Sequence, residues 1–138
     1  MTAVHFGSFS AARTNFKDLL DAADDGRPAT VSRDDRRVAV VDADRLRHAL
    51  TLIVPAPQAV PEGDGWSLLM PGLPVAADGA DLDAAIDDLI DALREYAEDW
   101  NSGLRLARNH RDNWGLVQLL DLSSDQQLHA WITGQALR

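Results

Sequence analysis

The sequence predicts an α+β protein made of two small parts, and three observations lead to this fold class. Apolar residues between Phe9 and Leu50 follow the order helix, break, β-hairpin and helix. Five of the six prolines lie between Pro55 and Pro74, which favours a linker and short strands over helix. A long amphipathic helix is predicted to begin after Asp81. A chain of 138 residues has room for two such parts, each with a limited core.

The first part is predicted to open with one helix, from about Ser8 to Ala23. Ser8 or Ser10 can act as its N-cap, because a serine oxygen accepts a hydrogen bond from an unpaired amide one turn into the helix. Gly26 and Pro28 end it, because both residue types interrupt helices. The apolar residues at helical spacing form one stripe: Phe16, Leu19, Leu20 and Ala23.

A β-hairpin is predicted next, between residues 29 and 41. β-branched and apolar residues lie on either side of a short charged loop: Thr30, Val31, Val38, Val40 and Val41. The tip presents three arginines to solvent: Arg33, Arg36 and Arg37. A short strand from Thr2 to Phe6 would pair with the hairpin as an edge. Asp42 can cap a short closing helix that ends near Leu50.

Residues 9–50 resemble the Phd/YefM, or prevent-host-death, family of bacterial antitoxins. The order and spacing of the matching residues are kept without a gap: Ser10, Ala12, Arg13, Asn15, Phe16, Leu19, Leu20, Gly26, Pro28, Val31, Ser32, Arg33, Val38, Ala39, Val40 and Val41. The resemblance implies a homodimer that binds palindromic operator DNA with a paired set of arginines. We therefore expect residues 1–50 to form a DNA-binding and dimerisation domain. A unit this small buries little apolar surface alone, which also favours dimerisation.

Five basic residues are the candidates for DNA contact: Arg13, Arg33, Arg36, Arg37 and Lys17. Guanidinium offers a planar, bidentate donor fork to phosphate and to guanine edges. The resemblance places Arg13 and Arg33 at operator-binding positions. Lys17 lies four residues after Arg13 and would share its helix face. The alternative interpretation is that arginines at helix starts and hairpin tips only interact with solvent, and Asp34 and Asp35 partly neutralise the hairpin tip.

The net charge of −9 is unevenly distributed along the chain. Residues 1–50 hold eight Lys/Arg and eight Asp, whereas residues 51–138 hold five Arg and fourteen acidic residues. A neutral half with exposed arginines indicates contact with phosphate, and an acidic half indicates contact with a basic partner. Alternatively, the acidic residues only keep a small protein soluble. The absence of cysteine and of any apolar stretch near about 18 residues predicts a cytoplasmic protein without membrane contact.

Residues 51–64 are predicted to be a proline-rich linker with a first short strand. Short extended pieces are predicted at 52–54 and 59–60, and strands at Trp66–Met70 and Val75–Ala77. These strands lead into the acidic helix.

The acidic helix is predicted to begin at the cap Asp81, to reach Trp100 and to end at Asn101-Ser102-Gly103. A further strand is predicted at Trp114–Leu120. The sequence Ser123-Ser124-Asp125-Gln126-Gln127 offers a capping box for a last short helix, because a serine and a glutamine three residues later can satisfy two amides reciprocally.

Residues 65–96 resemble the HicB-like antitoxin domain, in which strands with a Pro-x-Leu-Pro turn lead into an acidic, alanine-rich helix. The matching residues are Gly65, Trp66, Pro71, Leu73, Pro74, Gly79, Leu82 and Ala85. Val75 stands where that family usually has glycine. The resemblance implies that residues 65–138 form an acidic α+β domain.

The candidates for toxin contact lie on and after the acidic helix: Asp87, Asp91, Glu95 and Trp100. Ribonuclease-type toxins bind RNA and are usually basic, so an acidic face fits them. The alternative is a solvated helix face. Tryptophan is frequent at interfaces, but we expect Trp100, Trp114 and Trp131 to lie in the core.

The sequence argues against an enzyme. The four histidines are scattered, no metal-ligand spacing or glycine-rich phosphate loop is present, and no cofactor is expected. The HicB-like fold is related to ribonuclease H, so Asp64 and Asp78 are candidate metal ligands, although both fall in predicted turns, where aspartate is common. The favoured interpretation is a type II antitoxin that represses its own operon and neutralises a RelE/ParE-like ribonuclease. The alternative is a transcriptional regulator whose C-terminal domain serves oligomerisation or ligand sensing.

Overall fold

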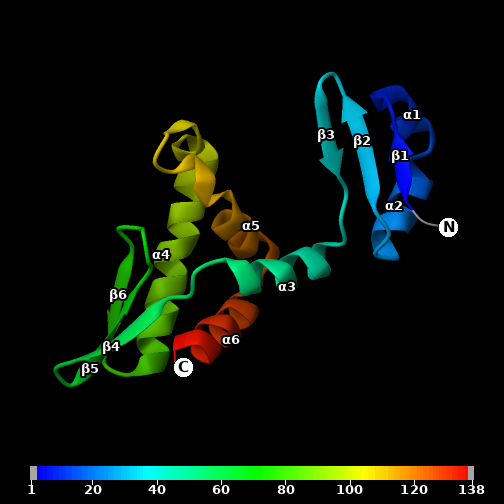
Figure 1. The fold of residues 1–138 in the computed structure, drawn as a ribbon. Helices are drawn as coiled ribbons and strands as arrows, with labels where there is room; N and C mark the ends of the chain where they lie inside the picture. The colour runs from blue at the N-terminus through cyan, green and yellow to red at the C-terminus, as the bar shows by residue number, and fades with distance from the viewer. Residues whose placement is uncertain (1–2, 137–138) are drawn as a thin grey trace. The chain divides into compact units, whose positions relative to one another are not determined.

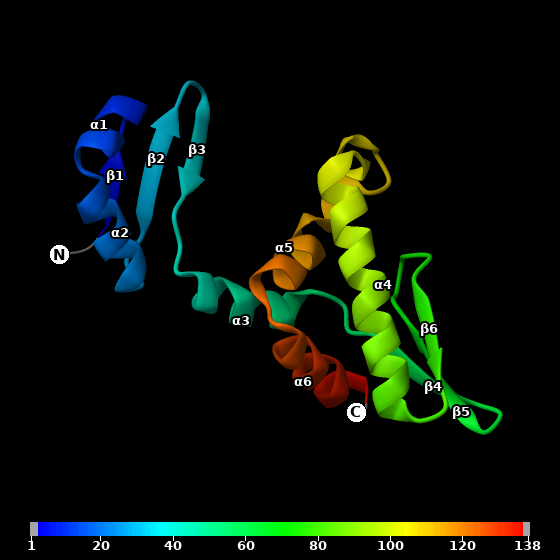
Figure 2. The ribbon, with the colours of Figure 1, turned by 180° about the vertical axis from the view of Figure 1, so that it is seen from behind.

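The computed structural model describes residues 3–136, with side chains up to Gly134, and the chain divides into two compact units. The first unit ends at Leu46 and the second begins at Arg47. Each unit contains one three-stranded sheet with helices (Figures 1 and 2). The predicted α+β class is therefore confirmed.

The first unit contains a sheet of strand order β1-β2-β3. Its elements are β1 (Val4–Phe6), α1 (Phe9–Thr14), α2 (Phe16–Asp24), β2 (Ala29–Arg33), β3 (Arg36–Ala39) and the start of α3 (Ala43–Ile53). Strand β1 runs parallel to β2, and β2 runs antiparallel to β3. The predicted hairpin and its edge strand are therefore present over the described residues, while Thr2 lies outside them. Asp42 caps α3, because its Oδ2 accepts from the backbone N–H of Arg45 at 3.0 Å.

The predicted single helix from Ser8 to Ala23 is wrong, because the chain breaks at Asn15. Asn15 has φ −114° and ψ 32°, and its side-chain amide donates to the carbonyl of Ala11 at 2.9 Å. A local side-chain bond of this kind competes with helical continuation. The predicted cap Ser8 is present, since its Oγ accepts from Ala11 N. The break places Arg13 and Lys17 on different helices, so the four-residue spacing does not align them.

The core of the first unit is small and rich in alanine. Its buried members are Ala12, Leu19, Ala22, Ala23, Ala29 and Val31. Phe16 and Leu20, which the predicted stripe places in the core, remain 54% and 46% exposed. All four residues of β3 are exposed as well. The unit therefore leaves large apolar side chains uncovered beside its third strand.

Gly26 allows the chain to turn tightly after α2. Its φ of 79° lies in the left-handed region, which strains a side-chain-bearing residue. A Cβ at this position would also lie 3.2 Å from the guanidinium carbon of Arg45. That guanidinium donates to the carbonyls of Ala23 and Asp24 at 3.3 and 2.7 Å. Arg45 thus gives the carbonyl of Asp24 a partner at the end of α2 and adds a second donor to the carbonyl of Ala23, which also accepts from the backbone N–H of Gly26.

The second unit contains a sheet of order β4-β5-β6 with antiparallel neighbours. Its elements are β4 (Gln58–Glu62), β5 (Gly65–Leu69), β6 (Ala76–Gly79), α4 (Leu82–Ser102), two 3₁₀ turns (Leu104–Leu106 and Arg111–Asn113), α5 (Trp114–Leu122) and α6 (Asp125–Ala136). Pro61 lies in β4, an edge strand, where a missing amide costs no ladder hydrogen bond. The second unit therefore holds more helix than the sequence predicts.

Two predicted extended segments are helical. Residues 52–53 belong to α3, and the run Trp114–Leu120 lies in α5. Four residues of α5 are buried: Leu116, Val117, Leu119 and Leu120. A continuous apolar run of this length fits a buried strand or a buried helix equally well by pattern. Packing against α4 decides the outcome in favour of helix.

Helix α4 is the centre of the second unit and packs against β5, β6, α5 and α6. Asp81 caps it, with Oδ1 accepting from Ala84 N at 2.8 Å, as predicted. The stripe residues Ile86, Leu89, Leu93 and Tyr96 are buried. A Cβ at Gly79 would lie 2.2 Å from the backbone nitrogen of Ala85. Only glycine therefore lets β6 approach the start of α4 so closely.

Arg94 ties α4 to the corner between α5 and α6. Its guanidinium donates to the carbonyl of Leu120, to the carbonyl of Ser123 at 2.8 Å and to Oδ1 of Asp125 at 2.8 and 3.1 Å. The capping box is formed by Ser124 and Gln127, whose reciprocal bonds measure 2.9 and 3.1 Å. Together these bonds define the start of α6 and its position on α4.

Candidate nucleic-acid interface and acidic grooves

The first unit has an apolar groove with two arginines at its rim. The groove has a volume of about 500 Å³ and is lined by Phe9, Ala12, Arg13, Phe16, Leu19, Val31, Arg33 and Val38. Arg13 comes from the last turn of α1, and Arg33 ends β2. The structure therefore brings together the two arginines that the Phd/YefM resemblance singles out, although they are twenty positions apart in sequence.

Both guanidinium groups lie over one aromatic ring. The guanidinium carbons of Arg13 and Arg33 are 6.0 and 5.9 Å from the centroid of Phe9. Among the described residues neither arginine has a carboxylate within 4.0 Å. An exposed cation–π contact is worth about 0.5–1 kcal/mol, enough to hold two side chains from separate elements near each other. Sequence reasoning missed Phe9, because its contact with Arg33 exists only in the folded unit.

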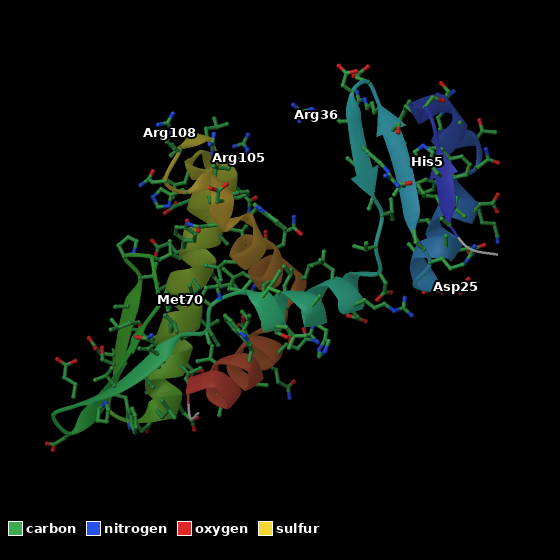
Figure 3. All side chains as sticks on the ribbon, viewed as in Figure 1. His5, Asp25, Arg36, Met70, Arg105 and Arg108 are labelled. Atoms are coloured by element: carbon green, nitrogen blue, oxygen red, sulfur yellow. The ribbon has the colours of Figure 1, made fainter. Side chains whose placement is uncertain are left out.

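The two other hairpin arginines lie on opposite faces of the sheet. Arg36 pairs with Arg33 and Arg37 pairs with Ser32 across the β2–β3 ladder. Opposite residues share a face and successive residues alternate. Arg36 therefore shares the face of Arg33 without lining the groove, and its side chain points away from the hairpin in Figure 3. Arg37 belongs to the other face.

Lys17 does not join the groove. Its Nζ lies 2.7 Å from Oδ2 of Asp21, one turn further along α2. The hydrogen bond that Lys17 donates to Asp21 and the negative charge of Asp21 raise the pKa of Lys17. The ion pair is exposed, and it holds the Lys17 ammonium against another residue of α2.

The predicted toxin-contact residues fall into two separate hollows of the second unit. Asp87 and Asp91 line a groove of about 550 Å³ between α4 and α6, together with Ile90, Asp125, Gln126, His129 and Ala130. His129 Nε2 lies 3.4 Å from Oδ1 of Asp83. We call this hollow the α4–α6 groove. Three carboxylates line it, of which Asp125 already pairs with Arg94. The carboxylates of Asp87 and Asp91, which form no ion pair among the described residues, lie beside Ile90 and make the groove suitable for a cationic side chain.

Glu95 lies in a different hollow, of about 400 Å³, with Tyr96, Asp99 and His110 among its lining residues. Trp100 is half-buried, and its Nε1 donates to the carbonyl of His110 at 2.8 Å. The four predicted toxin contacts therefore do not form one patch. Trp131 is buried as expected, but Trp114 is 49% exposed, so its assignment to the core is wrong.

The two aspartates considered as metal ligands do not form a cluster. Asp64 lies in the turn between β4 and β5, and Asp78 is an exposed residue of β6 in a hollow beside Glu62. Across residues 3–136 no group of three or more His, Asp or Glu side chains is placed to hold a metal ion. Within the same range no helix has the length and apolar character needed to cross a membrane.

Comparison with known proteins links the whole arrangement to toxin–antitoxin systems. Residues 3–131 match the model of the PHD-like family, which is described as "Antitoxin of toxin-antitoxin, RelE / RelB, TA system". A crystal structure from Syntrophomonas wolfei subsp. wolfei, described as an antitoxin part of a proposed toxin/antitoxin system, has a similar fold with a TM-score of 0.76. The sequences are 17% identical, and the match covers 95% of this chain and 96% of that chain. No match was found among curated proteins.

The family match extends over both units, so one family accounts for nearly the whole chain. Such a family points to a regulatory protein rather than an enzyme, and it favours the antitoxin over the plain transcriptional regulator. The chain belongs to the PHD-like family of antitoxins of toxin–antitoxin systems.

Proposed function

We propose that the protein is the antitoxin of a type II system, which binds operator DNA as a homodimer, represses its own operon and neutralises a RelE/ParE-like ribonuclease. The observation that carries the DNA-binding part is the pair Arg13 and Arg33, held over Phe9 at the rim of the apolar groove. Two guanidinium groups at one rim, neither with a carboxylate within 4.0 Å among the described residues, suit phosphate and base edges. In this proposal residues 1–50 are a Phd/YefM-like domain and residues 65–138 are a HicB-like domain that faces the toxin.

A second copy of the chain is the proposed occupant of the apolar groove. Phe9, Phe16 and Val38 line it and are each more than half exposed. Contiguous apolar surface of this kind marks an interaction site in a soluble protein. The small alanine-rich core of the first unit buries little apolar surface, and a partner copy would bury more. Two-fold symmetry would then present two Arg13–Arg33 pairs to a palindromic operator.

Replacing Phe16 with glutamate is expected to convert the dimer to a monomer. The new carboxylate would be buried without a partner in the proposed interface, at a cost of several kcal/mol. Sedimentation equilibrium at micromolar concentration measures the mass. The matched control is Leu20→Glu, which adds the same charge to the same helix at an exposed residue outside the groove. Equal masses for both variants would argue against this surface.

The α4–α6 groove is the proposed toxin-facing site. Asp87 and Asp91 supply negative charge, Asp125 is already paired with Arg94, and Ile90 and Ala130 supply apolar surface. RNA-binding toxins carry basic surfaces, so charge complementarity favours this side of α4. Glu95 and Trp100, which lie elsewhere, have a lesser role in the proposal.

Reversing the charge at both Asp87 and Asp91 to lysine is expected to abolish neutralisation. Placing like charges against a basic toxin costs several kcal/mol, or about 100-fold or more in affinity. The measurement is growth rescue on co-expression with the product of the neighbouring gene, followed by titration of the purified pair.

The matched control for this experiment is Asp88→Lys with Glu98→Lys. These exposed residues of the same helix lie outside the α4–α6 groove, and their replacement changes the net charge equally. The control variant is expected to rescue growth. If both double variants rescue equally, the toxin binds elsewhere, and if the unaltered protein fails to rescue, the antitoxin assignment to that neighbour is wrong.

A further inference from the structure

The segment that follows α4 is positively charged, although the second unit as a whole is acidic. We define the basic tip as residues 103–113, which include both 3₁₀ turns. Three of the five arginines in residues 51–138 lie here, at Arg105, Arg108 and Arg111, against one acidic residue, Asp112. The rest of this half is strongly acidic. A cluster of arginines on an acidic unit is a candidate binding site for an anionic partner.

Partly buried hydrogen bonds hold the basic tip against α4. His110 is the anchor: its carbonyl accepts from Trp100 Nε1 at 2.8 Å, and its Nδ1 lies 2.9 Å from Tyr96 Oη. Asn113 Nδ2 donates to the same Tyr96 oxygen at 2.9 Å. Backbone bonds from His110 and Arg111 to the carbonyl of Ala107 close the turn. The tip is therefore ordered before any partner binds, which lowers the entropic cost of binding.

The three arginines of the tip are exposed. Figure 3 shows Arg105 and Arg108 extending away from the turn. Among the described residues no carboxylate lies within 4.0 Å of Arg105, Arg108 or Arg111. Arg105 makes one hydrogen bond, from Nη1 to the carbonyl of Asn101 at 3.1 Å. Leu106, which lies between Arg105 and Arg108 in the sequence, is 79% exposed, and Trp114 at the start of α5 is 49% exposed.

We propose that the basic tip is a second nucleic-acid contact, which binds backbone phosphates of duplex DNA. Exposed guanidinium groups without a carboxylate partner among the described residues, next to the exposed side chains of Leu106 and Trp114, suit phosphate and sugar. This inference rests on the proposed DNA binding, and it extends it to the acidic unit. Of the two proposed partners, a toxin with a basic surface would be repelled by the tip. DNA is the partner whose charge is complementary.

The test compares the full-length protein with the double variant Arg105→Ala/Arg108→Ala. Binding to a labelled duplex of the upstream promoter is followed by fluorescence anisotropy over a range of salt concentrations. Each lost phosphate contact reduces the slope of log K against log salt by about 0.9. We expect the magnitude of the negative slope to decrease by roughly 2 for each tip that contacts DNA, so that binding depends less on salt. Affinity at low salt is expected to decrease about tenfold or more.

The control variant is Gln58→Glu/Gln118→Glu, which makes the net charge more negative by the same two units at exposed residues of β4 and α5. It is expected to weaken binding less and to keep the slope. A variant at Arg105 and Arg108 with the unaltered slope and affinity would overturn the inference, while Arg13→Ala in the same assay reports separately on the proposed function. The inference would also be overturned if the Arg105→Ala/Arg108→Ala variant bound DNA normally but differed from the unaltered protein in oligomeric mass or in affinity for the toxin. The tip would then be a contact between proteins.

Discussion

Replacing Arg13 or Arg33 with alanine is expected to weaken binding to upstream promoter DNA by roughly 5- to 150-fold, which corresponds to about 1–3 kcal/mol per lost arginine contact. In a symmetric dimer each substitution removes two contacts, so the larger value is expected. Both guanidinium groups lie over Phe9 and lack a carboxylate partner among the described residues, so they are available to DNA. Anisotropy with the promoter duplex measures the loss.

The control for this pair is Arg27→Ala. Arg27 belongs to the same unit and its loss changes the charge equally, but it is paired with Asp25 at 3.1 Å and lies outside the groove. Its replacement is expected to change affinity far less. Thermal unfolding of all three variants shows that the fold is kept. If Arg13→Ala and Arg33→Ala behave like Arg27→Ala, the proposed interface is wrong.

Replacing Arg94 with alanine is expected to lower the free energy of unfolding of the second unit by about 2–4 kcal/mol. The loss leaves the carbonyls of Leu120 and Ser123 without their charged donor, and hydrogen bonds to charged groups contribute about 1.5–3 kcal/mol each. The ion pair with exposed Asp125 adds little. Urea unfolding measures the change, with fluorescence of the tryptophans, including buried Trp131, as the signal.

Arg94→Lys separates the shape of the side chain from its charge. An ammonium cannot reach three acceptors in the planar geometry of a guanidinium, so lysine is expected to recover only a minor part of the stability. Arg105→Ala is the control, because that arginine makes one exposed hydrogen bond, and its loss is expected to cost less than about 0.5 kcal/mol. Equal losses for Arg94→Ala and Arg105→Ala would contradict the structural role of Arg94.

The Arg94 bonds also bear on function. Asp125 accepts from Arg94 and lines the α4–α6 groove, so the same guanidinium positions one of the three carboxylates of the groove proposed to face the toxin. A variant at Arg94 is therefore expected to reduce growth rescue at elevated temperature more than at low temperature, as the start of α6 loosens.

The local signals in the sequence were sufficient to predict several elements correctly. The caps at Ser8 and Asp81 and the hairpin from β2 to β3 were all predicted from neighbouring residues. Each depends on partners a few positions apart, so local propensity and spacing describe it fully. The excess of acidic residues in residues 51–138 follows directly from counting residues in the sequence.

Tertiary packing decided the features that depend on distant residues. The apolar run of α5 became helix because α4 buries it, and the identical run could have formed a strand. Asp87, Asp91 and Glu95 follow one helical spacing, yet α6 borders the first two and the basic tip borders the third. Phe9 meets Arg33, and Arg94 meets Leu120, only after folding. The sequence by itself determined where the arginines and the acidic residues lie along the chain, whereas the fold decided which of them lie together, because side chains far apart in the chain meet only through packing.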